Sequence, residues 1–122
     1  MARVVLKVHE MDRVNEAMAA VTTASLFAAV DASAGAEYAA SGRDDKTLLL
    51  IQNAATSAKT VTVKAGNGIQ GVNDLSVSVP ASSTTALVLD SGRYKNVSGD
   101  DRGKIIVLGE SADIKLAVIV LP

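Results

Sequence analysis

The chain has 122 residues, of which 48% are hydrophobic, and its formal net charge is −1. This length fits one domain, and the near-neutral charge gives no bulk attraction to DNA, RNA or anionic lipid. The absence of cysteine excludes disulfides and thiolate metal sites, and a content of one Phe, two Tyr and no Trp predicts an aliphatic core.

The first 22 residues differ in pattern from the rest, and we expect residues 1–22 to form an N-terminal arm. Residues 4–8 alternate as in a short strand. Four apolar side chains then recur at spacings of three and four: Met11, Val14, Met18 and Val21. This spacing predicts one short amphipathic helix over residues 10–22.

The N-terminal sequence does not resemble a secretory signal. Lys7, His9 and Glu10 interrupt any long apolar run there. No stretch of the chain approaches the roughly 18 apolar residues that a membrane span needs. We therefore expect a soluble protein that is not conventionally exported.

From Thr23 onward the apolar residues alternate with a period of two, which is typical of β-strands. The clearest strands are predicted at residues 46–53, 59–65, 74–80, 84–90, 104–109 and 113–122. The first of these is apolar on both faces, so we expect it to be a central strand. The pattern predicts a mainly β protein, in which residues 23–122 form a single antiparallel β-sandwich or jelly-roll-like domain.

Gly66, Gly68 and Gly71 have the G-x-G-x-x-G spacing of a dinucleotide-binding turn. Such a turn must lead into a helix, whose first amides hold the pyrophosphate. Here it leads into the alternating residues 74–80, which end in a proline. We therefore predict a structural loop, with glycines at positive φ and with Ile69 or Val72 plugging the end of the sandwich.

The residue types needed for catalysis are sparse. His9 is the one histidine, and we expect it at the surface or capping the arm. The pairs Asp44–Asp45 and Asp100–Asp101 stand among turn formers, where carboxylates solvate a turn. We predict no catalytic residue, no cofactor and no metal ligand, and we expect that the protein is not an enzyme.

Three stretches together resemble a known family: "TLLLIQNAATSAKTVTVKAGNGIQGVNDLSVSVPASSTTALVLDSGRYKN", "GKIIV" and "SADIKLAVIVL". They resemble the small β-sandwich proteins of tailed bacteriophages described as head decoration, or cement, proteins. The resemblance extends from about Ala24 to Leu121, and "SGRYK" is its most telling part. The predicted arm is longer than the lead-in of that pattern, which also fits a fibre or tail-associated relative.

The resemblance implies a non-enzymatic virion protein that binds the outer surface of a capsid and stabilises it. Its partners would be the major capsid protein and neighbouring copies of itself, and it would be made in the host cytoplasm. The stripe of Met11, Val14, Met18 and Val21 then suits docking on a partner, although it equally suits packing on its own sandwich.

A carbohydrate- or surface-binding β-sandwich, such as a fibre or adhesin subunit, is the alternative. Sugar sites generally stack the sugar ring on Trp or Tyr. With two Tyr and no Trp, this chain has few residues for that purpose.

Overall fold

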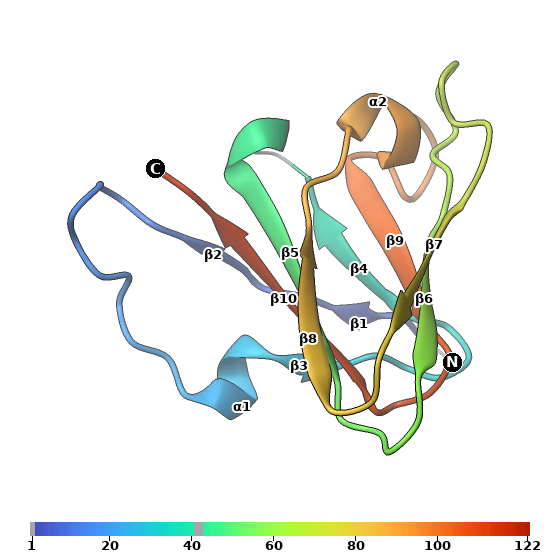
Figure 1. Ribbon diagram of the computed structural model, residues 1–122. Coiled ribbons are helices and arrows are strands. Elements are labelled where there is room, and N and C mark those ends of the chain that lie inside the picture. Colours follow the sequence, from blue (N-terminus) through green and yellow to red (C-terminus); the bar gives the residue numbers. More distant parts are fainter. Residues whose placement is uncertain (1, 41–42) are drawn as a thin grey trace.

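The computed structural model describes residues 2–40 and 43–122, which form two packed five-stranded sheets (Figure 1). Sheet A contains, in spatial order, β1 (Val4–Val5), β4 (Ala36–Ala39), β9 (Lys104–Gly109), β6 (Lys59–Val63) and β7 (Leu75–Val79). Sheet B contains β2 (Val8–Glu10), β10 (Ile114–Val120), β5 (Thr47–Asn53) and β8 (Ser83–Leu87), with β3 (Ala28–Ala29) also paired to β10. The predicted β-sandwich is confirmed.

The pairing is mixed, so the expectation of a purely antiparallel sandwich is wrong. β1 runs parallel to β4, and β2 runs parallel to β10. The chain thus crosses from sheet A to sheet B between Val4 and Glu10, so β1 and β2, within the predicted arm, belong to the sheets. A period of two is the same in parallel and antiparallel strands, so it cannot report strand direction.

The helix predicted over residues 10–22 is absent. The helical elements are α1 (Thr23–Leu26), α2 (Ser91–Tyr94) and the 3-10 turn η1 (Asp44–Lys46). None of the helices in residues 2–40 and 43–122 is long and apolar enough to cross a membrane. A short isolated helix is marginal unless its apolar stripe is buried, and here Val14 is 71% exposed.

The core between the sheets is aliphatic apart from Tyr38, in agreement with the aliphatic core that the composition predicted. Its largest fully buried side chains are Leu49, Ile51, Val61, Val63, Val79, Val107, Ile114, Leu116 and Val118. Buried Asn53 at the end of β5 donates from Nδ2 to the carbonyl of Val79 at 3.0 Å and accepts from the Ala55 amide at 2.9 Å. These bonds satisfy the buried amide and tie β5 to the end of β7.

β5 is central in sheet B, as its two apolar faces predicted, since it lies between β10 and β8. Its inward residues Leu49 and Ile51 are buried, whereas Leu48 and Leu50 point out of the sandwich and are half-buried. The second apolar face of β5 therefore forms part of the outer surface of sheet B.

Tyr38 provides a test of the core. Burial, with a smaller contribution from the charge of Asp44, raises the pKa of its phenol above the usual 10. The neutral phenol therefore contributes stability that is fully present below the pKa of an unfolded tyrosine, about 10. This contribution is lost as the pH rises from that value toward the higher pKa of the folded state. We expect Tyr38→Phe to lose less stability than the native chain between about pH 8 and pH 10.5 in urea unfolding. Equal losses in both proteins would contradict this.

Candidate functional site

The glycine loop and α2 lie together at one end of the sandwich (Figure 1). The Gly66 amide donates to the Arg93 carbonyl at 2.8 Å. Asn67 donates from Nδ2 to the Ser98 carbonyl at 2.9 Å and accepts from the Val97 amide at 2.7 Å. The loop after β6 is thus fixed to the segment after β8 by backbone-directed bonds.

Carboxylates hold the backbone at this end. Asp90 caps α2 by accepting from the Gly92 amide at 2.8 Å, and Asp44 accepts from both the amide and the hydroxyl of Ser91 at 3.0 Å. Asp74 accepts from the Ala65 amide at 2.6 Å and from Lys64 Nζ at 2.9 Å. These two bonds hold the pKa of Asp74 below its usual value. All three carboxylates serve the local structure.

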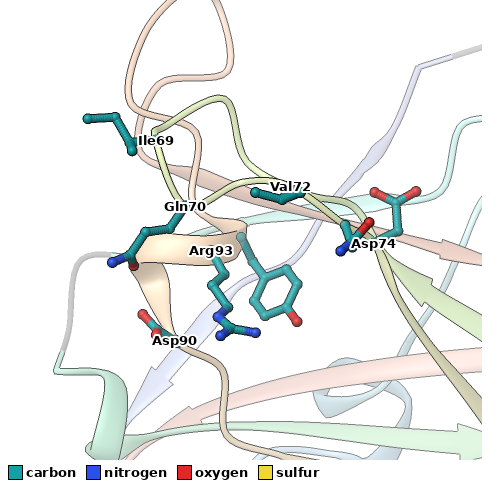
Figure 2. A pocket seen from close by; sticks show the side chains of 8 residues that line it. Ile69, Gln70, Val72, Asp74, Asp90 and Arg93 are labelled. Atoms are coloured by element: carbon teal, nitrogen blue, oxygen red, sulfur yellow. The ribbon is translucent and has the colours of Figure 1, made fainter.

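An open groove of about 740 Å³ separates the loop from α2 (Figure 2). Its lining is of mixed character and consists of Ile69, Gln70, Val72, Asn73, Asp74, Asp90, Arg93 and Tyr94. Figure 2 shows Gln70 extending toward the α2 side, while Ile69 points away. Amide groups, a guanidinium and one phenol are chemically suited to hydrogen bonding with a polar ligand.

Gln70, Arg93 and Tyr94 were not predicted from the sequence to line one groove. The signal for this end is "SGRYK", a polar run with one aromatic residue directly after an apolar strand, which was noted only for its resemblance. The expectation that Ile69 or Val72 plugs the sandwich is wrong, because these side chains are 101% and 75% exposed. Partly buried Tyr94 packs against the core at this end instead.

The glycine spacing reflects close backbone approach. The loop leads into β7, as the alternation predicted. The prediction of positive φ at its glycines is wrong, because among residues 2–40 and 43–122 the glycines at positive φ are Gly35, Gly99 and Gly103. A Cβ on Gly71 would overlap the carbonyl oxygen of Gly66, whereas one on Gly68 would have its nearest contact at 3.6 Å.

The predicted docking residues do not share a helical face. Val14 and Val21 are exposed by 71% and 38%, while Met11 and Met18 are half-buried. They belong to the loop between β2 and α1, residues 11–22. This loop is the part of the predicted arm that follows β2, and from here on it alone is called the arm. Figure 1 shows the arm extending away from the two sheets. The Met11 amide bonds to the Val120 carbonyl at 2.9 Å, but residues 12–21 make no backbone hydrogen bond to the described sheets.

The other singled-out polar residues are dispersed. His9 is buried in β2 instead of standing at the surface, and its Nε2 has no partner among the described residues. Asp45 pairs with Arg43, and Asp101 pairs with Arg3. Within residues 2–40 and 43–122, no three His, Cys, Asp or Glu side chains are grouped as metal ligands would be.

The outer faces of the two sheets differ in polarity along the β7 and β8 side of the sandwich. On sheet A, β6 and β7 present the hydroxylic residues Thr60, Thr62, Ser76 and Ser78, and the half-buried Ile106 and Leu108 of β9 lie beyond them on the same face. Sheet B presents the apolar side chains of Leu48, Leu50, Ala86, Val88 and Ile119. The sequence signal for this apolar face was the uninterrupted apolar run Leu48–Ile51 within residues 46–53.

Comparison of the chain with protein-family models, with curated proteins and with solved structures finds no match.

The two glycine environments generate a matched prediction. We expect Gly71→Ala to destabilise the protein by about 1–3 kcal/mol, because its methyl group displaces the Gly66 backbone. We expect Gly68→Ala to change stability by less than about 0.5 kcal/mol, because its methyl group would make only ordinary van der Waals contact with Val97, at 3.6 Å. Urea unfolding of the two variants measures the difference, and equal stabilities would show that close approach at Gly71 is unimportant.

Proposed function

We propose that this protein is a non-enzymatic structural component of a phage head that binds the outer surface of the capsid and stabilises it. The observation that carries the proposal is the arm, which stands off a well-packed sandwich with Val14 and Val21 exposed. The resemblance of residues 24–121 to head decoration proteins supports the choice of a capsid as the partner.

The polar chemistry of the molecule supports a mechanical role. The carboxylates near the groove accept hydrogen bonds from backbone amides, as Asp74, Asp90 and Asp44 do. Glu37 is 9% exposed and pairs with Arg3 at 3.2 Å and with Lys104 at 2.8 Å, which joins the N-terminus to β9. These groups rigidify the fold, and a rigid body loses little entropy when it binds a surface.

Burial of the arm supplies the attachment energy. Removing a large aliphatic side chain from water contributes about 1.5–3 kcal/mol. Val14, Val21 and half-buried Met18 together would contribute several kcal/mol on a partner surface, offset by the cost of ordering the arm. Because the chain is nearly neutral, we expect attachment to depend only weakly on salt.

The arm is tested by substitution within it, because deletion of residues 1–22 would also remove β1 and β2 from the sheets. We expect Val14→Asp, Met18→Asp and Val21→Asp together to weaken binding to undecorated phage heads about a hundredfold or more. The melting temperature should stay close to that of the native chain, because residues 12–21 make no backbone bond to the described sheets. Cosedimentation with heads measures the binding.

Val97→Asp is the matched control, since Val97 is 55% exposed at the groove end of the sandwich. We expect this variant to bind heads like the native chain. Native-like binding by the triple variant would refute docking through the arm. Loss of binding in Val97→Asp alone would move the docking surface to the groove end.

The groove favours carbohydrate binding as a second candidate function. It combines the ring of Tyr94 with the side chains of Gln70, Asn73 and Arg93, which are of the types that hold sugar hydroxyls. If this is the function, Arg93→Ala and Gln70→Ala should abolish binding in a glycan array while leaving head binding unchanged. Absence of any glycan signal in the native chain would eliminate this candidate.

A further inference from the structure

We propose that β8 is an interface between two copies of this chain, which pair antiparallel about a twofold axis. β8 is the last strand of sheet B and pairs with β5 from Leu49↔Leu87 to Asn53↔Ser83. No strand in residues 2–40 and 43–122 pairs with its other side. Such an edge exposes backbone N–H and C=O groups, and another strand is the partner that satisfies them in register.

The charge pattern of β8 permits pairing with itself. Residues 83–89 carry no charge, and the nearest charged residue is Asp90. In an antiparallel pair centred on Thr85, the two Asp90 residues lie about 33 Å apart at the usual strand rise, well beyond the screening length of about 10 Å. β1 differs, since Arg3 and Lys7 flank it and self-pairing would bring its two Arg3 residues within about 10 Å.

The outer surface distinguishes β8 from β7, which is also an uncharged edge. The outward residues of β7, Ser76 and Ser78, lie beside Thr60 and Thr62 on β6, so the outer surface next to this edge is hydroxylic. Ala86 on β8 is exposed and Val88, just after β8, is 57% exposed, next to half-buried Leu48 and Leu50 on β5. Pairing through β8 joins the apolar rows of two copies and removes apolar area from water, which pairing through β7 does not.

These features favour β8 of a second copy of the chain as the strand that pairs with the free edge of β8. Antiparallel pairing of identical strands is isologous: each copy gives and receives the same contacts. It also uses up the free edge of both copies, so assembly by this route closes at two. Every copy supplies a strand of matching length and zero charge. The inference does not depend on the proposed capsid role, because it concerns the purified protein alone.

The test is sedimentation equilibrium of the full chain, with β8 and β7 variants compared. We expect the native chain to dimerise, and Thr84→Lys with Ala86→Lys to raise the dimer dissociation constant about tenfold or more, because lysines then oppose one another across the axis. Ser76→Lys with Ser78→Lys places the same charges on β7, the uncharged edge of sheet A, and should leave dimerisation unchanged. Thr84→Lys alone, at an exposed side chain, serves if the double variant does not fold.

Amide hydrogen exchange gives an independent measurement. We expect protection of residues 83–87 to rise with protein concentration, while protection of β7 stays constant. A native chain that remains monomeric at about 1 mM would overturn the inference. So would a dimer that the β7 lysines break and the β8 lysines do not. Protection of β8 only on binding to heads would assign the edge to a capsid segment and would likewise overturn it.

Discussion

The unpaired backbone groups at the two edges of each sheet are the constraint on which this architecture depends. On one side a single segment forms the edge of both sheets: β1 pairs with β4 in sheet A, and β2 pairs with β10 in sheet B. Leu6 lies between the two strands, is 5% exposed and donates its amide to the Glu37 carbonyl at 2.8 Å. The N-terminal segment therefore closes one side of the sandwich, while β7 and β8 leave the other side open.

The arm is part of the segment that connects β2 to β3, the two strands that pair with one edge of β10. β2 and β3 lie along the same edge of β10, since Glu10 is opposite Val120 and Ala28 is opposite Leu116. Four residues of strand separate these positions, about 13 Å at the usual rise, so a few residues of loop would span them. The chain instead uses residues 11–27. The fold does not require this extra length, and long loops on a rigid scaffold are where binding functions concentrate.

The sequence predicted the features that depend on side-chain alternation. Val61, Val63 and Val79 are buried as the period of two required, and β5, which contains the apolar run Leu48–Ile51, is a central strand. Strand direction was missed because it depends on which free edge a segment reaches. The helix at 10–22 was missed because four apolar residues at helical spacing form a helix only when something buries them. Here Val14 and Val21 remain exposed.

The candidate site was less predictable for a similar reason. The groove joins residues 69–74 to residues 90–94, which are distant in sequence, and its walls are set by bonds such as that from the Gly66 amide to the Arg93 carbonyl. The G-x-G-x-x-G spacing suggested positive φ, but the need for glycine at positions 66 and 71 comes from backbone lying against backbone. The spacing of residues along the chain does not show which backbone segments will lie in contact, so it could not predict why glycine is needed at these positions.

The two proposed surfaces occupy opposite edges of sheet B, and this placement has a consequence for binding. The arm leaves from the β2 side, whereas β8 ends the sheet on the other side. A dimer joined through β8 would therefore carry its two arms at the outer ends of one continuous sheet. Once the first arm is bound, the second is held near the same shell and binds at a high effective concentration. Weak apolar attachment by each arm would then suffice for stable occupancy, which fits an arm with few exposed apolar side chains and a chain with almost no net charge.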